Sequence, residues 1–95
     1  MVIGRVVGTV VSSSNSINIQ GARYLLVEKT NQRGDKKGDY LVALDIVGAG
    51  YDELVFVSES TSARETPGTV NKPVDALIVG IIDLIDDNET IVYKK

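Results

Sequence analysis

The chain has 95 residues, with 10 Lys and Arg against 13 Asp and Glu, a formal net charge of −3, and neither Cys nor His. A net negative chain has no excess of cations for phosphates or anionic lipid, so nucleic acids and membranes are disfavoured as partners. Without Cys and His, disulfides, thiolate nucleophiles, Cys-ligated metal sites and the commonest general base are excluded, and an enzymatic function is disfavoured.

The N-terminal stretch 2–11 predicts a β-strand. It is rich in Val and interrupted by Gly4 and Gly8, a pattern that suits a strand bent at the corner of a barrel and that disfavours a helix. No signal-peptide features precede it, and no apolar run approaches the roughly 18–20 residues that span a bilayer. We therefore expect a cytoplasmic protein.

A hairpin is predicted in the first half of the chain, after a polar loop at 12–23. Its strands are residues 24–29 and 39–46, and the segment between them contains turn-forming Asn, Asp and Gly residues. We expect this segment to form a long, mobile tip. The stretch 47–50 then predicts a tight turn before a further strand at 54–57.

The second half begins with the longest polar stretch, residues 58–72. Loops of this length are usually functional or mobile. Pro73 can open a single short helical turn. Strands at 77–82 and 90–93 flank turn-favouring residues, which predicts a C-terminal hairpin.

Six or seven short strands with at most one short helix indicate an all-β fold. Their number and close spacing predict a small OB-like β-barrel of five to seven strands. The length corresponds to one domain, covering residues 1–95.

The turn residues Gly48, Ala49 and Gly50 resemble a phosphate-binding loop only superficially. The Gly-Lys-Ser/Thr ending of a P-loop is absent, and so are the third glycine and the helix of a dinucleotide fingerprint. We interpret the segment as a turn whose glycines supply positive φ or close backbone approach.

Acidic residues offer two further candidate sites. The cluster of Asp83, Asp86, Asp87 and Glu89 lacks the spacing and the glycine of an EF-hand loop, which favours a solvated turn over a cation site. A pair drawn from Asp45, Asp75 and Asp83 could perform acid–base chemistry. The sequence alone brings no two of them together, and strand-end solvation or a loop hydrogen bond is favoured.

Ser60–Arg64 combines hydroxyl groups with one guanidinium, which could hold a phosphate or carboxylate or could be an ordinary solvated loop. The composition leaves both open. The aromatic residues are few and scattered, without the basic residues that interleave them in single-strand-binding OB-folds, so packing in the core or at an interface is the preferred role. They are Tyr24, Tyr40, Tyr51, Phe56 and Tyr93.

Several stretches share their order and spacing with one known family. They are GRVVGTVV (4–11), LLV (25–27), ALDIVGAG (43–50), SAR (62–64) and PVD (73–75) followed by VGIID (79–83). In these segments the chain resembles the bacterial microcompartment vertex proteins of the EutN/CcmL type. It departs from them at Asp52, where the family often has glycine, and at Ser60-Thr61, where it often has Gly-Ser. The hairpin ending at residues 91–95 looks closer to the ethanolamine-type branch than to the carboxysome branch.

The resemblance implies an OB-like barrel that assembles into a cyclic pentamer and fills the vertices of a shell otherwise tiled by hexameric proteins. It implies no catalytic residues, cofactor or metal. We hypothesise that the subunit contact includes Gly48, Ala49 and Gly50 together with Ser62, Ala63 and Arg64. In this contact Arg64 would bond carbonyls or a carboxylate of the next chain, and the 31–37 tip would be dispensable.

Two other functions stay open at this point. A nucleic-acid-binding OB module is disfavoured by the charge of −3 and by the weak aromatic pattern. A small enzyme would need Arg64 and a convergent pair of carboxylates with perturbed ionisation.

Overall fold

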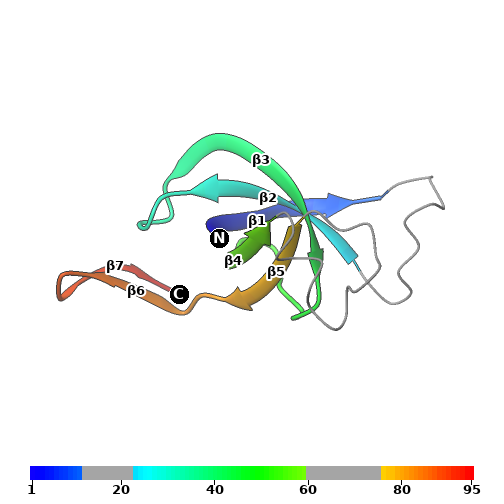
Figure 1. Ribbon diagram of the computed structural model, residues 1–95. Helices are drawn as coiled ribbons and strands as arrows, with labels where there is room; N and C mark the ends of the chain where they lie inside the picture. Colours follow the sequence, from blue (N-terminus) through cyan, green and yellow to red (C-terminus); the bar gives the residue numbers. More distant parts are fainter. Residues whose placement is uncertain (12–22, 60–75) are drawn as a thin grey trace.

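The computed structural model describes residues 1–11, 23–59 and 76–95, which form seven β-strands. Figure 1 shows a barrel from which a C-terminal hairpin projects. The described residues contain no helix, and therefore no helix that could span a membrane. The strands are β1 (Val2–Val10), β2 (Arg23–Thr30), β3 (Lys36–Asp45), β4 (Leu54–Glu59), β5 (Ala76–Ile81), β6 (Leu84–Asp87) and β7 (Thr90–Lys94).

The first five strands close into a barrel in the order β1-β2-β3-β5-β4. All neighbours are antiparallel except β3 and β5, which pair in parallel through Leu44 with Leu77 and Asp45 with Ile78. This closed five-stranded barrel confirms the predicted small OB-like fold. Alternate residues point inward and form one apolar core, whose fully buried members include Val27, Ala43, Val55, Val57 and Ile78.

Gly4 allows β1 to lie close against β2. A Cβ atom at this position would collide with Cγ1 of Val27 and would lie 3.0 Å from the carbonyl oxygen of Glu28. The β1–β2 register also shifts between Val6 and Gly8, where a bulge bends the strand. The glycine-interrupted stretch is therefore a bent barrel strand, as its composition predicts.

The predicted pairing of 77–82 with 90–93 is wrong. β5 is hydrogen-bonded to β4 on one edge and, through Leu77 and Ile78, to β3 on the other, whereas β7 pairs with β6. The chain leaves the barrel after Ile82, whose amide donates to the carbonyl of Leu54 at 2.8 Å. A separate short strand, β6, then pairs with β7 in its own two-stranded sheet.

The first hairpin has a shorter tip than expected, because β3 begins at Lys36 rather than at Asp39. The Asn31 side chain organises this tip: its Oδ1 accepts hydrogen bonds from the amides of Arg33 at 2.8 Å and Asp35 at 3.0 Å. A long mobile segment is therefore replaced by a hydrogen-bonded turn.

Of the polar loops expected at 12–23 and 58–72, Arg23 instead begins β2, and Ser58 and Glu59 end β4. The rest of both loops and the helical turn at Pro73 lie outside the described residues.

Candidate functional site

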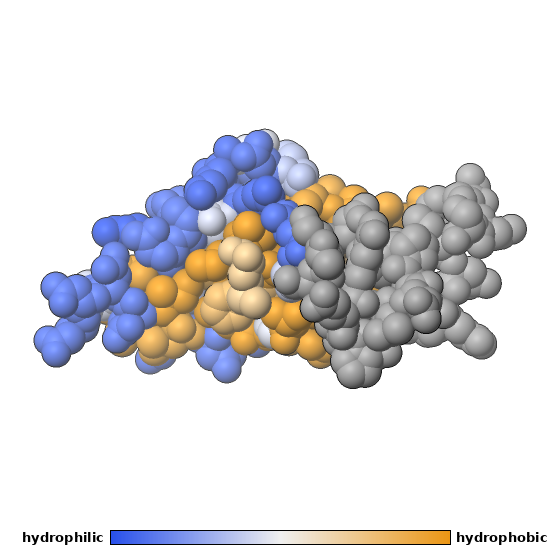
Figure 2. Space-filling view, in the orientation of Figure 1, coloured by the Kyte–Doolittle hydropathy of each residue, from blue (hydrophilic) through white to orange (hydrophobic). Residues whose placement is uncertain are grey.

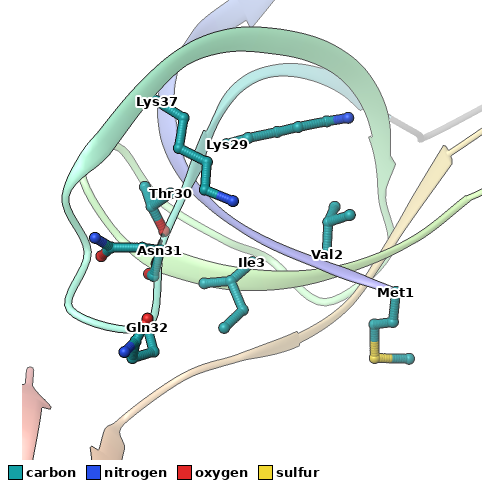
Figure 3. A pocket seen from close by; sticks show the side chains of 8 residues that line it. All are labelled: Met1, Val2, Ile3, Lys29, Thr30, Asn31, Gln32 and Lys37. Atoms are coloured by element: carbon teal, nitrogen blue, oxygen red, sulfur yellow. Dashed lines mark hydrogen bonds between the residues drawn. The ribbon is translucent and has the colours of Figure 1, made fainter.

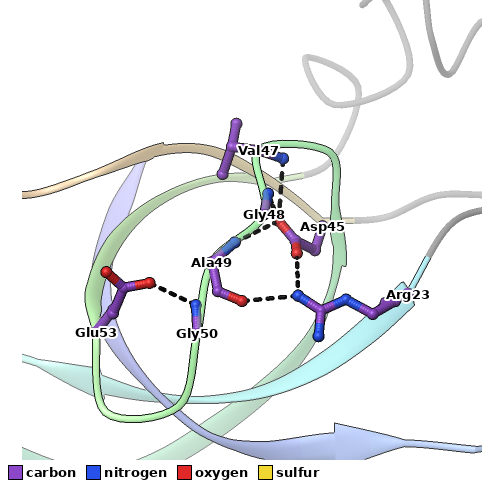
Figure 4. Close-up of polar contacts among 7 residues, drawn as sticks. All are labelled: Arg23, Asp45, Val47, Gly48, Ala49, Gly50 and Glu53. Atoms are coloured by element: carbon purple, nitrogen blue, oxygen red, sulfur yellow. Dashed lines mark hydrogen bonds and ion pairs between the residues drawn. The ribbon is translucent and has the colours of Figure 1, made fainter.

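The turn after β3 is organised by one buried carboxylate. Oδ1 of Asp45 accepts the backbone amides of Val47 and Gly48, both at 3.0 Å, and of Ala49 at 3.2 Å (Figure 4). Three consecutive amides therefore converge on one oxygen atom. This arrangement satisfies backbone donors that the sharp turn removes from the β3 ladder.

The second oxygen of Asp45 binds Arg23, at the start of β2. Arg23 Nη2 donates to Oδ2 of Asp45 at 2.7 Å and to the carbonyl of Ala49, also at 2.7 Å (Figure 4). The Asp45 side chain is 2% exposed and that of Arg23 is 54% exposed. The carboxylate is thus charge-compensated from the solvent side, as a buried charge requires.

These contacts determine the ionisation of Asp45. Burial raises its pKa, but the hydrogen bonds from Arg23 and from the amides of Val47, Ala49 and Gly48 lower it by more, so the net pKa lies below the usual value. Asp45 is therefore a structural anion rather than a group held ready to exchange a proton.

Glu53 supports the other end of the turn. Its Oε1 accepts the amide of Gly50, and its Oε2 pairs with Lys95 Nζ at 2.6 Å. The hydrogen bond from Lys95 and that from Gly50 lower the pKa of Glu53, and Glu53 in turn raises the pKa of Lys95. The C-terminal residue is thereby attached to the barrel turn.

The turn presents apolar side chains on a rigid support. Ala49 is 1% exposed and packs into the barrel core, whereas Ile46, Val47 and Tyr51 are exposed. Gly48 has φ of 79°, a conformation that favours glycine. The outward surface of the turn is therefore Ile46, Val47 and Gly48, while Ala49 anchors it.

The structure brings no pair of the candidate acid–base carboxylates together. Asp45 is committed to the turn, Asp83 is exposed, and Asp75 lies outside the described residues, as do Ser62, Ala63 and Arg64. Within 1–11, 23–59 and 76–95, no group of three or more acidic residues could hold a metal ion. Asp86 and Asp87 lie in β6, and Glu89 lies in the turn that follows.

Three contacts around this turn are not predicted by the sequence. Arg23 was assigned to a polar loop, although it is the first residue of β2 and the partner of Asp45. Arg5 donates to the carbonyl of Asp52 at 2.9 Å and lies 5.9 Å above the Tyr93 ring. Glu53 carried one available signal: an acidic residue three positions after a glycine can accept that glycine's amide.

A shallow depression of about 370 Å³ lies beside the start of β1 (Figure 3). Several of its polar groups already have partners: Lys29 pairs with Glu59 at 3.6 Å, the Thr30 hydroxyl donates to the carbonyl of Asn31 at 3.0 Å, and Gln32 Nε2 donates to Asp87 at 3.4 Å. We therefore assign it no ligand. It is lined by Met1, Val2, Ile3, Lys29, Thr30, Asn31, Gln32 and Lys37.

Comparison with known proteins gives one consistent result. The family described as "Ethanolamine utilisation protein EutN/carboxysome" matches residues 1–83. The carboxysome shell vertex protein CcmL of Gloeobacter violaceus is 44% identical over 96 residues, which cover 100% of this chain and 96% of that protein. The similarity therefore extends over the whole chain.

Solved structures agree with this similarity. CcmL of Nostoc sp. PCC 7120 superposes with a TM-score of 0.92 at 40% identity, covering 100% of both chains. The GrpN pentameric microcompartment shell protein of Rhodospirillum rubrum superposes with a TM-score of 0.79 at 36% identity, covering 92% of this chain and 99% of GrpN.

The identities argue against the expected kinship with the ethanolamine-type branch. EutN of Escherichia coli is 28% identical over 95 residues, covering 100% of both chains, whereas Gloeobacter CcmL is 44% identical. These identities describe the whole chain, and the family match at residues 1–83 does not include the hairpin that begins at Leu84.

Proposed function

Because the chain belongs to the EutN/CcmL family of bacterial microcompartment shell vertex proteins, we propose that it closes shell vertices as a pentamer surrounded by hexameric shell proteins. It is a structural shell component, and its function depends on shape and on the complementarity of its edges. The observation that carries the proposal is the end-to-end similarity to CcmL, in sequence and in the barrel itself.

The proposed pentamer needs a head-to-tail contact, in which one surface of each chain meets a different surface of the next. We place the turn at residues 48–50 in this contact. Asp45 and Arg23 hold the turn rigid before assembly, and Ile46 and Val47 offer apolar area beside Gly48. A preorganised apolar turn loses little conformational entropy when it is buried.

The second part of the proposed contact is the segment Ser62, Ala63 and Arg64. Its support is the Ser-Ala-Arg match to the family, together with the ability of a guanidinium to bond two carbonyls or a carboxylate at once. We propose that Arg64 reaches across to the neighbouring subunit.

The mass of the purified protein in solution tests the pentamer. Native mass spectrometry should find five times the chain mass of 10.2 kDa, and mixing with hexameric shell proteins should yield closed particles rather than open sheets or tubes. A stable monomer at micromolar concentration would refute the pentamer. Closed particles that omit this protein would refute its place at the vertices.

The role of Arg64 has its own test. Arg64→Ala should weaken the pentamer on dilution, whereas Arg33→Ala, at the exposed tip of the first hairpin, should leave it unchanged. Equal oligomer stability in the two variants would exclude Arg64 from the contact.

A further inference from the structure

Arg5, on β1, contacts three segments that are far from it in the sequence. Its Nη1 donates to the carbonyl of Asp52 at 2.9 Å, in the turn that follows β3. Its Nη2 donates to the carbonyl of Gly34 at 3.4 Å, at the tip of the β2–β3 hairpin. Its Cζ lies 5.9 Å from the centre of the Tyr93 ring, on β7. One guanidinium therefore joins a turn and a tip of the barrel to the C-terminal hairpin.

The tip packs closely against both Arg5 and the C-terminal hairpin. A Cβ atom at Gly34 would lie 2.7 Å from Nη2 of Arg5 and 3.5 Å from Cδ1 of Tyr93. The amide of Gly34 donates to the carbonyl of Asn31 at 3.1 Å, which closes the tip into a turn. The tip therefore supports the carbonyl that Arg5 binds, and it leaves no room for a side chain at position 34 unless Arg5 moves.

Two further contacts lie on either side of Arg5 along the C-terminal hairpin. At its base, Lys95 Nζ pairs with Glu53 at 2.6 Å. At the end of β6, Asp87 accepts a hydrogen bond from Gln32 Nε2 at 3.4 Å. Figure 1 shows the β2–β3 tip at the end of the molecule from which this hairpin projects. The hairpin is thus held against the barrel at several points along its length.

The Arg5 contacts are the best protected of these. The Arg5 side chain is 20% exposed, whereas Gln32 and Asp87 are both exposed and water competes for their hydrogen bond. A guanidinium largely withdrawn from water is attracted to an aromatic face, and its planar fork binds two carbonyls in fixed directions. Arg5 therefore contributes more to the position of the hairpin than the Gln32–Asp87 contact does.

The C-terminal hairpin needs support from the barrel. Within the described part of the chain, β6 and β7 form a sheet of two strands only, and such a sheet is marginally stable in water by itself. Only Ile82 and Asp83 separate β5 from β6, and rotation about their backbone bonds changes the direction of the hairpin. Figure 2 shows mainly hydrophilic residues at the projecting end of the molecule and hydrophobic residues over its middle. Polar contacts are therefore well placed to set this direction.

We propose that Arg5 is a positioning residue that fixes the direction of the C-terminal hairpin relative to the barrel, with the tip at 31–35 as its support. The contacts lie within one chain, so the proposal goes beyond the proposed function and does not depend on the pentamer. It also gives the tip a role in the single chain, although the hypothesis from the sequence makes 31–37 dispensable for assembly. Without the guanidinium, the hairpin should take several directions while the barrel keeps its fold.

The distance between two spin labels tests this direction. The chain has no Cys, so T9C/T90C carries one label on β1 and one on the hairpin, both at exposed positions. Mixing with an excess of unlabelled chains keeps each measured distance within one chain. Arg5→Met retains an unbranched apolar side chain but has no charge and no donors. It should broaden the distance distribution by about two-fold or more, and a distribution identical to that of the unsubstituted chain would refute the proposal.

Arg33→Met is the matched control for the loss of a positive charge. Arg33 is exposed at the same tip, so its substitution should leave the distance distribution unchanged. Broadening equal to that of Arg5→Met would assign the effect to net charge and would overturn the positioning role.

Two variants of Tyr93 test the contact between Arg5 and the hairpin. Tyr93→Phe keeps the aromatic face and should leave the distance distribution narrow. Tyr93→Leu removes that face and should broaden the distribution as Arg5→Met does. A narrow distribution in Tyr93→Leu would contradict the proposal, because Tyr93 is the hairpin residue beneath the guanidinium.

Amide exchange separates a positioning role from a general effect on stability. Arg5→Met should accelerate exchange in β6 and β7 by roughly 2- to 30-fold, the factor that corresponds to the loss of a cation–π contact. Exchange in β1 to β4 should keep its rate, since those strands pair with one another in the barrel. Equal acceleration in the barrel and the hairpin would show that Arg5 stabilises the whole chain and would refute the positioning role.

Discussion

The turn at residues 45–53 and the hairpin at residues 84–94 both end in exposed apolar side chains, yet they are supported differently. In the turn, Asp45 is buried and binds three amides and a guanidinium within its own chain. In the hairpin, the Gln32–Asp87 contact is exposed, and Leu84 and Ile91 face solvent. The turn is complete in the single chain, whereas the hairpin is only half covered.

This difference indicates how a small barrel can combine stability with assembly. A ring-forming surface that is rigid before assembly loses little entropy on binding. An element that lacks internal partners gains its stability from the neighbouring subunit. We therefore expect changes in the turn to alter the stability of the chain and changes in the hairpin to alter the ring.

The largest expected effect is on the turn. Asp45→Ala should lower the free energy of unfolding by about 2–4 kcal/mol, because it leaves three amides without their acceptor and Arg23 without its partner. Asp86→Ala, at an exposed position of the hairpin, should change it by less than about 0.5 kcal/mol. Urea unfolding of both variants measures the contrast, and equal losses would contradict it.

Strong acid should destabilise the turn by protonating Asp45. The pKa of Asp45 is lower in the folded chain than in the unfolded chain, where it is about 3.9. Its contribution to stability is therefore complete above that value and is lost as the pH falls through the folded-state pKa. Unfolding midpoints measured between pH 6 and pH 2 should fall less steeply for Asp45→Asn than for the wild type. An unchanged slope would contradict the role of the ionised carboxylate.

Two residues with a left-handed backbone conformation, one in each region, allow a comparison in which smaller effects are expected. Asp52 in the turn and Glu89 in the hairpin have φ of 70° and 69°, a conformation that favours glycine. Asp52→Gly should stabilise the whole chain by about 0.5–1 kcal/mol, since Arg5 keeps its bond to the carbonyl of residue 52. Glu89→Gly completes an Asn-Gly turn. It should slow amide exchange in β6 and β7 without changing the unfolding midpoint of the whole chain. A changed midpoint would contradict the view that the hairpin and the barrel are stabilised separately.

The smallest expected effect concerns the ion pair between Glu53 in the turn and Lys95 at the end of the hairpin. Glu53→Gln keeps an acceptor for the Gly50 amide but removes the charge that pairs with Lys95. Exchange should accelerate at the Lys95 amide, which donates to the Asp83 carbonyl at 2.9 Å. The acceleration should disappear at high salt, where the exposed wild-type ion pair is screened. Unchanged exchange at low salt would show that the pair does not hold the end of the hairpin.

Local patterns predicted most of the barrel. The Val-rich stretch with Gly4 and Gly8 identified β1, and alternating apolar runs identified β2 to β5 within a few residues of their observed ends. The Gly48 turn followed from glycine chemistry, and the resemblance at ALDIVGAG led to the correct family. These predictions are correct because side-chain alternation in a strand and the type of a turn depend on residues that are neighbours in the sequence.

Long-range pairing was the part that the sequence could not provide. Arg23 and Asp45 are 22 positions apart, and Arg5 and Asp52 are 47 apart, so neither pair leaves a local signal. The first strand predicted for the C-terminal hairpin is wrong for the same reason, since only the closed barrel shows that β5 lies between β3 and β4.

The sequence by itself determined the barrel strands, the OB-like class and the family, because these depend on residue alternation, turn chemistry and motif order within short segments. Only the tertiary structure decided which carboxylate is buried, where β3 meets β5 and which side chains of the hairpin are exposed. Those properties arise when strands far apart in the chain close into a barrel. In the described part of the chain, β3 and β5 pair only at Leu44 and Asp45, and the place where this barrel is weakly closed is a property of the whole fold.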